Sequence, residues 1–243
     1  MTDKPRLTDI PTEWTLIRTA HTTVPVGGSD PETAIAMERL IGRYHDAVGR
    51  YLKLKLRDEN LADEVAQEFW TKLLTQKLAG ADPSKGRFRD YLRTVLHRLI
   101  IDHFRGRKVQ PLPPGDLLDP STTDQEFDQV WRETLIDRVW LRLQTFELNT
   151  PKNRYASVLK LRREHPDAPI EDLALILGKQ LNGKVTPEAF RKTLQRARAK
   201  FLELLVQELR ETIHPAEQED IEAEIYDLGL GSLYRRYSEE NPS

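Results

Sequence analysis

The sequence of 243 residues contains no cysteine. This absence excludes disulfide bonds and cysteine-ligated zinc sites, and it fits a reducing compartment. The sequence also lacks an uninterrupted apolar run of about eighteen residues, so we expect no membrane-spanning helix. Because residues 1–14 carry no apolar segment of the secretory type, we expect no signal peptide there. These absences together predict a cytoplasmic protein.

The sequence motifs of catalysis are missing as well. The histidines form no HExxH pattern and no paired metal-ligand spacing, and the sequence has no glycine-rich phosphate loop and no nucleophile motif. We therefore expect neither an enzyme nor a metal or cofactor site, and the function is expected to lie in binding surfaces.

The composition is that of a folded protein. Hydrophobic residues make up 38% of the sequence and charged residues 31%, a balance typical of globular chains. The chain is long enough for one or two domains with hydrophobic cores. The formal net charge of −2 argues against a protein that coats nucleic acid non-specifically, but it allows local basic patches that acidic stretches balance.

A strongly basic stretch, residues 86–108, predicts one amphipathic helix. Apolar residues recur three and four apart, as on one helix face: Phe88, Tyr91, Leu92, Val95, Leu96, Leu99 and Phe104. Seven Lys and Arg against two Asp give the stretch a local net charge of +5. Because cations hold phosphates and rings stack on exposed bases, this helix is a candidate binder of single-stranded nucleic acid. The alternative is a solvated basic face on a bundle helix.

Two further helices are expected before this basic helix. Asp30 as N-cap and Pro31 in the first turn predict a helix that runs to about Arg57. Gly42 and Gly49 lie inside it, where each costs about 1 kcal/mol relative to alanine. Close packing of a neighbouring helix would explain these glycines.

The next helix is expected to start at an Asn60 cap and to run to about Leu78. Its buried stripe would consist of Leu61, Val65, Phe69 and Leu73. The opposite face carries Asp63, Glu64, Gln67, Glu68 and Thr71, with Trp70 at its edge. An acidic face beside a large aromatic suits docking on a basic partner helix, and the alternative is an ordinary solvated face.

Proline density predicts an extended linker over residues 106–126, and the later part of this linker is acidic. We therefore expect an all-α protein with two small helical domains joined by a Pro-rich acidic linker. The expected divisions are an N-terminal extension (1–29), a first domain (30–105), the linker (106–126), a second domain (127–214) and an acidic C-terminal tail (215–243).

The second domain contains a helix-turn-helix pattern. Residues 169–178 predict a short apolar helix closed by Gly178, and Thr186 followed by Pro187 predicts the start of the next helix. That helix carries basic residues and has no acid between positions 189 and 201. A basic helix of this size fits the DNA major groove, and the alternative is a basic bundle helix. The turn between the helices is longer than the usual three or four residues.

In this order the motifs resemble the extracytoplasmic-function (ECF) sigma factors of bacterial RNA polymerase. Residues 89–92 (RDYL) and 99–105 (LIIDHFR) resemble motifs of sigma region two, and residues 62–70 (ADEVAQEFW) resemble its clamp-binding stretch. Residues 173–178 and 186–201 resemble the helix-turn-helix of region four.

Three smaller features, at residues 13–17, 86–89 and 212–228, are similar to the ECF-type factors abundant in planctomycetes. The sequence departs from the family pattern at Leu61, where an acid is frequent, at Arg98, where asparagine is usual, and in the longer region-four turn.

The resemblance implies a sigma factor that binds core RNA polymerase and directs promoter recognition, DNA melting and transcription initiation. The clamp helices of the beta-prime subunit would bind Asp63, Glu64, Gln67, Glu68 and Trp70. The minus-ten DNA would be bound by Arg87, Phe88, Arg89, Tyr91, Arg93, His97, Arg98 and Arg105. The minus-thirty-five DNA would be bound by Arg191, Lys192, Gln195, Arg196 and Arg198. An anti-sigma factor or a Ser/Thr kinase would be a further partner of the kind such factors often have.

Two other functions stay open on the sequence. A stand-alone helix-turn-helix regulator would bind duplex DNA tightly by itself, whereas a sigma factor would need core polymerase. An all-helical adaptor would be insensitive to neutralisation of Arg191 and Lys192. In addition, the acidic segment 217–224 could lie over a basic surface and weaken DNA binding.

Overall fold

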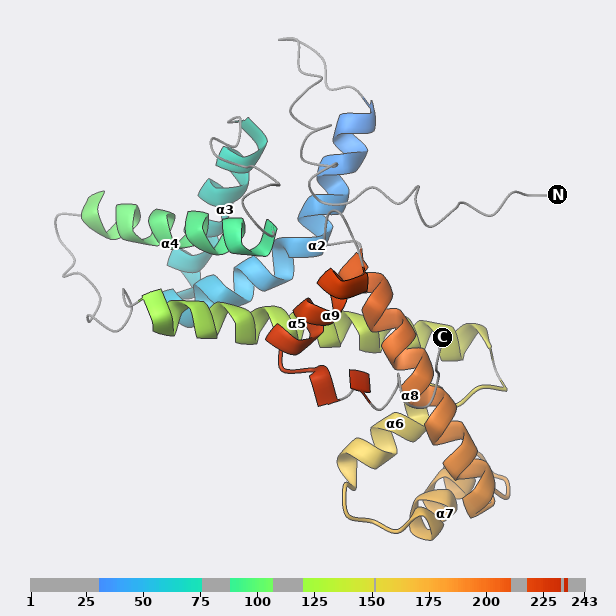
Figure 1. The fold of residues 1–243 in the computed structure, drawn as a ribbon. Helices are drawn as coiled ribbons and strands as arrows, with labels where there is room; N and C mark the ends of the chain where they lie inside the picture. Colours follow the sequence, from blue (N-terminus) through green and yellow to red (C-terminus); the bar gives the residue numbers. More distant parts are fainter. Residues whose placement is uncertain are drawn as a thin grey trace. The chain divides into compact units, whose positions relative to one another are not determined.

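The computed structural model describes residues 31–75, 88–106, 120–150, 152–210, 218–232 and 234–235. Within these ranges every regular element is a helix, which agrees with the expected all-α fold (Figure 1). The chain divides into two compact units. Unit 1 comprises Met1–Thr134 and Arg210–Ile221, and unit 2 comprises Leu135–Leu209 and Glu222–Ser243.

Unit 1 contains α2 (Pro31–Leu56), α3 (Glu59–Thr75) and α4 (Phe88–Gly106). Helix α2 packs on α3, and α3 packs on α4. The predicted apolar stripe of α3 is confirmed, because all four of its residues are buried. On α2 Tyr44, Val48, Tyr51 and Leu52 are buried, whereas Ile35 is 50% exposed.

A short turn joins α2 to α3 and corrects one sequence expectation. Arg57 adopts a left-handed backbone conformation with φ 53° directly after α2. The carboxylate of Asp58 then accepts the backbone N–H of Leu61 at 3.0 Å. This bond is the N-cap interaction of α3. The predicted cap at Asn60 was therefore wrong, since the helix begins at Glu59, before Asn60.

The surroundings of the two glycines of α2 also differ from those inferred from the sequence. A Cβ atom added to Gly42 or to Gly49 would meet no atom within 4 Å among the described residues. The sequence interpretation explained these two positions by close packing of a neighbouring helix. In the described part of the chain no such neighbour reaches them.

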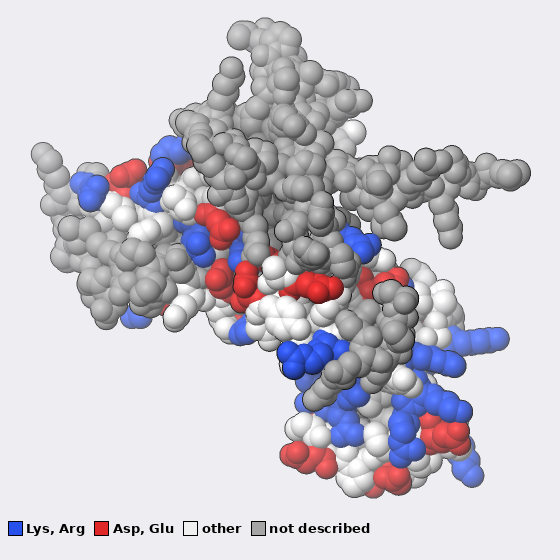
Figure 2. Space-filling model, viewed as in Figure 1, with Lys and Arg blue, Asp and Glu red and all other residues white. Residues whose placement is uncertain are grey.

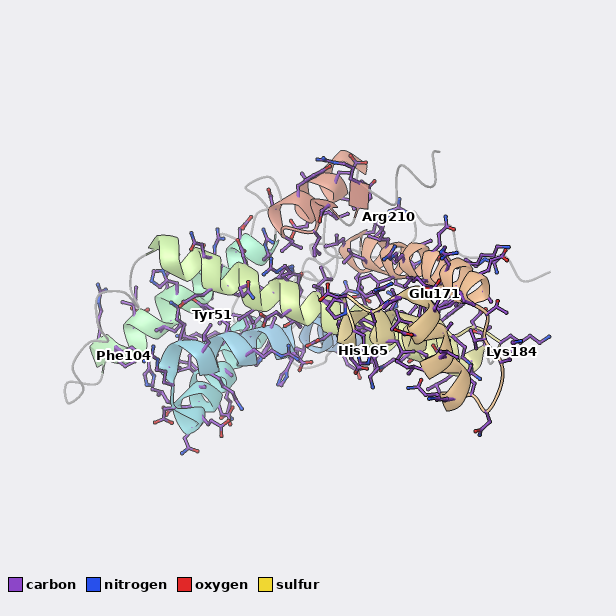
Figure 3. All side chains as sticks on the ribbon, turned by 90° about the horizontal axis from the view of Figure 1, so that it is seen from below. Tyr51, Phe104, His165, Glu171, Lys184 and Arg210 are labelled. Atoms are coloured by element: carbon purple, nitrogen blue, oxygen red, sulfur yellow. The ribbon has the colours of Figure 1, made fainter. Side chains whose placement is uncertain are left out.

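Helix α5 (Pro120–Asn149) contributes to both units, because the boundary between the units falls after Thr134. Its first half packs on α2. Trp131 stacks on Tyr44 with ring centroids 5.0 Å apart, and Phe127 meets Tyr51 edge-on at 5.1 Å. Figure 3 shows Tyr51 in the interior between α2 and α5. Residues 120–126, expected to be extended linker, are helical; the limits of the functional domains stay a prediction.

Unit 2 is built around α6 (Tyr155–Glu164), α7 (Ile170–Gln180) and α8 (Pro187–Arg210), with the second half of α5. The three helices share one hydrophobic core, formed by Val158, Leu161, Leu173, Ala174, Leu177, Phe190 and Leu194. Helix α5 joins α8 through the rings of Trp140 and Phe201 at 5.7 Å, and through Arg142, which donates to Glu208 at 2.7 Å.

The turn between α7 and α8 is closed by backbone hydrogen bonds. The N–H of Gly183 donates to the carbonyl of Gly178 at 2.9 Å, and the N–H of Asn182 donates to that of Lys179 at 3.3 Å. Asn182 has φ 50°, so these bonds form the Schellman arrangement with Asn182 in the left-handed position. The predicted closure at Gly178 was wrong, because α7 continues to Gln180.

Gly178 has a different role inside α7. A Cβ atom at this position would lie 2.8 Å from the carbonyl oxygen of Gly183. Glycine therefore permits the returning chain to approach the helix, and the close approach fixes where α8 begins.

Part of the segment that the sequence analysis assigned to an acidic C-terminal tail, residues 215–243, is helical. It forms α9 (Gln218–Asp227), and Ile221, Ile225 and Leu228 are buried. Gly229, with φ 70°, follows the helix and supplies the left-handed conformation of its end. This part of the predicted tail therefore packs its apolar side chains within the fold.

Candidate nucleic-acid and partner interfaces

The acidic face predicted for the second helix lies on the exposed side of α3. Asp63, Glu64 and Gln67 are exposed, and Glu68 is half-buried. Glu68 forms an ion pair with Lys72 at 2.7 Å, one helical turn away. Since surface pairs of this kind contribute little, the carboxylate of Glu68 can exchange Lys72 for a partner's cation at small cost. The arrangement provides an acidic helix surface beside the buried stripe.

Trp70, the fifth residue predicted for this face, is mainly a packing residue. Its ring stacks on His45 of α2 at 6.2 Å and meets Phe69 edge-on at 4.8 Å. The ring is half-buried. Trp70 therefore fixes the edge of the acidic face against α2, while the charged residues of that face remain in water.

Helix α4 holds its predicted DNA-binding residues in two different environments. Arg89 is buried, and its Nε lies 3.7 Å from the carboxylate of Asp128 on α5. Arg93 is half-buried; its guanidinium lies 3.7 Å from the same carboxylate and 3.4 Å from that of Asp90. These two arginines thus connect α4 to α5 within unit 1.

Arg98 and Arg105 on α4 are exposed, together with Thr94 and Asp102. Tyr91 and His97 are half-buried beside this strip. Burial raises the pKa of the Tyr91 hydroxyl, and the nearby charge of Arg98 lowers it by a smaller amount. Tyr91 is therefore a neutral phenol at physiological pH, with a ring next to an exposed guanidinium. Figure 3 shows Phe104 near the C-terminal end of the same helix.

Part of the predicted minus-ten set lies outside the described residues. This is the case for Arg87 and for the side chain of Phe88, although α4 begins at Phe88. The structure therefore brings together Tyr91, His97, Arg98 and Arg105 on the outer side of α4, and it places Arg89 and Arg93 against α5.

Helix α8 presents its predicted DNA-binding residues without such cover. Arg191, Lys192, Gln195, Arg196 and Arg198 are all exposed. Lys192 pairs with Glu188 at 2.8 Å on the surface. Among the described residues no acid pairs with Arg191, Arg196 or Arg198. Figure 2 shows Lys and Arg side chains gathered over the part of the molecule that α6 to α8 form in Figure 1.

The start of α8 is fixed as the sequence predicted. The N–H of Ala189 donates to the hydroxyl of Thr186 at 3.2 Å, so Thr186 is the N-cap and Pro187 is the first helical residue. Phe190, Leu194 and Ala197 are buried beneath the basic side chains. One face of α8 therefore packs into the core of unit 2, and the opposite face exposes the basic side chains to solvent. Lys184, in the preceding turn, points away from the helices (Figure 3).

Sequence reasoning did not find three charged residues that pair α5 with α2 and α4: Lys55, Glu126 and Asp128. Lys55 is buried and forms an ion pair with Glu126. The acidic character of residues 116–126 was visible in the sequence. Nothing in the sequence indicated that a helix would carry Glu126 and Asp128 onto α2 and α4.

Neither a metal-binding cluster of three or more His, Cys, Asp or Glu nor a helix able to cross a membrane is found in the ranges that the structure describes.

The comparison with protein families bears on the functions that these charged helix faces allow. Residues 40–109 match the sigma-70 region 2 family. The matched segment includes the buried half of α2, all of α3 with its acidic face, and all of α4. The match supports a sigma factor of the sigma-70 family, the class of protein that binds core RNA polymerase and promoter DNA. No curated protein and no solved structure matches the chain.

Proposed function

We propose that the chain is a two-region sigma factor of the ECF type, which binds core RNA polymerase and directs promoter recognition and DNA melting in the cytoplasm. The observation that carries this proposal is the region 2 match over residues 40–109, combined with a second exposed basic helix, α8, outside the match. The planctomycete subgroup stays a prediction, as does the absence of enzymatic activity.

Core polymerase would bind the acidic face of α3. Asp63, Glu64 and Gln67 are exposed on one side of a helix whose other side is fully packed. A rigid helix that presents carboxylates without deforming loses little conformational entropy when it docks on a basic helix. Trp70 would form the edge of this interface rather than its centre, because its ring already packs on His45 and Phe69.

Promoter DNA would be bound by two helices. On α4, Arg98 and Arg105 would hold the backbone of the melted minus-ten strand, and Tyr91 would offer a ring beside them. On α8, residues from Arg191 to Arg198 would contact the duplex minus-thirty-five element as the second helix of a helix-turn-helix. The close α7–α8 turn and the Thr186 cap support this assignment, since they hold the start of α8 in one position.

A pull-down with bacterial core RNA polymerase tests the proposal. The wild-type chain is expected to bind, and Asp63→Arg/Gln67→Ala is expected to lose binding. A matched control is Glu38→Arg, which reverses an exposed charge on α2 outside the matched residues. Absence of binding by the wild type, or equal loss in the control variant, would contradict the proposed role of the α3 face.

A stand-alone DNA-binding regulator is the second candidate, and the exposed α8 cations are the observation that favours it. That function predicts tight, sequence-specific binding of duplex DNA by the isolated chain. The sigma-factor proposal predicts weak duplex binding until core polymerase is added. A gel-shift titration with and without core polymerase distinguishes the two.

The acidic C-terminal segment and a regulatory partner stay predictions. Glu222 accepts the hydroxyl of Tyr234 at 2.8 Å, and Glu224 is buried. These two carboxylates are therefore engaged within the fold. A chain ending before Pro215, compared with the full chain at low and high salt, shows whether the segment weakens promoter binding. An anti-sigma factor or a Ser/Thr kinase would be sought by co-purification.

A further inference from the structure

The first turns of α5 place two carboxylates on three cations of α2 and α4. Glu126 forms an ion pair with Lys55. Asp128 lies 3.7 Å from the guanidinium of Arg89 and 3.7 Å from that of Arg93. All five residues belong to unit 1. One short helical segment thus neutralises a cationic cluster that two other helices build.

The carboxylates lie on the outside of this cluster. The side chains of Lys55, Arg89 and Arg93 are 3%, 7% and 22% exposed, whereas those of Glu126 and Asp128 are 36% and 35% exposed. The two carboxylate side chains are therefore more exposed than the cations with which they pair. An external anion that binds Arg89 or Arg93 would compete with Asp128 for the same guanidinium groups.

Aromatic packing holds the carboxylates in this position. Trp131 stacks on Tyr44, and Phe127 packs edge-on against Tyr51. Both α5 rings are buried. Because ion pairs at the edge of a protein contribute little by themselves, the rings rather than the charges fix α5 on α2. The acids are consequently presented to the cations even at high salt.

The chemistry of Asp128 is that of a phosphate group. A carboxylate and a phosphate both offer negatively charged oxygens to guanidinium groups, and arginine binds both with the same planar set of donors. We propose that Asp128 is a built-in phosphate mimic, an α5 latch that keeps Arg89 and Arg93 from the backbone of single-stranded DNA. This inference rests on the proposed function of α4 as the helix that binds the melted strand.

The latch divides the cations of α4 into two sets. Arg98 and Arg105 are exposed and can meet DNA in the free protein. Arg93 gains a phosphate only when Asp128 gives way, and it keeps Asp90 as a second acidic neighbour at 3.4 Å. The free chain would therefore bind single-stranded DNA weakly. Movement of the first turns of α5 away from α4 would raise its affinity for the strand.

A reversible change of charge at residue 128 tests the latch in one folded protein. The chain has no cysteine, so Asp128→Cys provides a single thiol, and this position is accessible to small reagents. Methyl methanethiosulfonate converts the thiol to a neutral group, whereas the ethylsulfonate reagent MTSES adds a negative charge. The measurement is fluorescence anisotropy of a labelled single-stranded DNA oligonucleotide at several salt concentrations.

We expect the neutral derivative to bind about five times more tightly than the wild type, and its salt dependence to steepen by about 0.7 in log–log slope, the value of one added phosphate contact. The MTSES derivative is expected to return toward wild-type affinity. The gain should disappear when Arg93→Gln is added. Equal affinities of the two derivatives would overturn the latch, and circular dichroism of both confirms that they share one fold.

Two controls separate the latch from general charge effects and from the proposed function. Glu133→Gln removes a negative charge from the exposed side of the same helix and should leave the affinity unchanged. Arg98→Gln/Arg105→Gln should weaken DNA binding in the wild-type background. If that double variant loses affinity while the residue 128 series shows no difference, only the latch is contradicted. If no variant binds DNA at low salt, the nucleic-acid role of α4 is contradicted as well.

Discussion

Helices α4 and α8 look alike in sequence and differ in their surroundings. Both are amphipathic helices with several arginines, and both were predicted to bind DNA. On α8 Arg191, Arg196 and Arg198 are exposed. On α4 Arg89 is buried and Arg93 half-buried, and both lie 3.7 Å from Asp128. The same residue type therefore stabilises the fold on one helix and remains available to a ligand on the other.

The difference shows that local charge does not by itself identify a nucleic-acid surface. What decides the role of an arginine is whether another element brings an acid to it. For α4 that element is α5, whose Asp128 lies 39 residues along the chain from Arg89 and 35 from Arg93. For α8 the ion pairs of its lysines are formed within the helix itself, between Glu188 and Lys192 and between Glu203 and Lys200.

The largest expected effect concerns the rings that hold α5 on α2. Trp131→Ala should destabilise unit 1 by about 3–5 kcal/mol, because it deletes a buried indole that stacks on Tyr44. Chemical denaturation followed by circular dichroism measures the loss. Leu141→Ala, at an exposed position of the same helix, should change stability by less than about 0.5 kcal/mol. Similar values for the two variants would mean that α5 is not an integral part of unit 1.

Two helical glycines, Gly178 in α7 and Gly49 in α2, are expected to change stability in opposite directions when replaced by alanine. Gly178→Ala should destabilise the chain by about 1–3 kcal/mol, because the new methyl group would lie 2.8 Å from the Gly183 carbonyl oxygen. Gly49→Ala should stabilise it by about 1 kcal/mol, since the added carbon meets no described atom and alanine is the better helix former. Thermal unfolding compares them, and stabilisation by Gly178→Ala would disprove the close approach that positions α8.

One pair of substitutions tests the comparison of α4 and α8 directly. Arg89→Gln should cost about 1–2 kcal/mol of folding stability, because it leaves the partly buried Asp128 with one cation fewer. Arg191→Gln should cost less than about 0.5 kcal/mol and should reduce DNA binding instead. Urea titrations provide the first quantity and anisotropy with duplex DNA the second. A stability loss of the same size in both variants would remove the distinction.

A smaller effect than that of Trp131→Ala is expected at the start of α8. Thr186→Ala should cost about 1 kcal/mol, because it removes the acceptor of the Ala189 N–H. Thr186→Ser keeps the hydroxyl and should restore most of this stability. Thermal unfolding of the two variants provides the measurement, and an unchanged midpoint in the alanine variant would show that the cap bond contributes nothing.

Local patterns in the sequence predicted the helices and many of their buried faces. The stripe of α3 and the cap at Thr186 depend on residues three and four apart, so no distant contact was needed to find them. The end of α7 was mispredicted at Gly178 because Asn182, which is less favourable than glycine in the left-handed region, takes the terminal position. The cover of Arg89 by Asp128 depends on contacts distant in sequence, which residue spacing does not encode.

The most direct test of the central claim is competition for core RNA polymerase. A labelled sigma-70 family factor is bound to the core enzyme, and the unlabelled chain is added in increasing amounts. The proposal predicts displacement by the wild type and none by Asp63→Arg/Gln67→Ala, because both factors would need the same clamp surface. Binding of the chain to core polymerase without displacement of the labelled factor would contradict its function as a sigma factor.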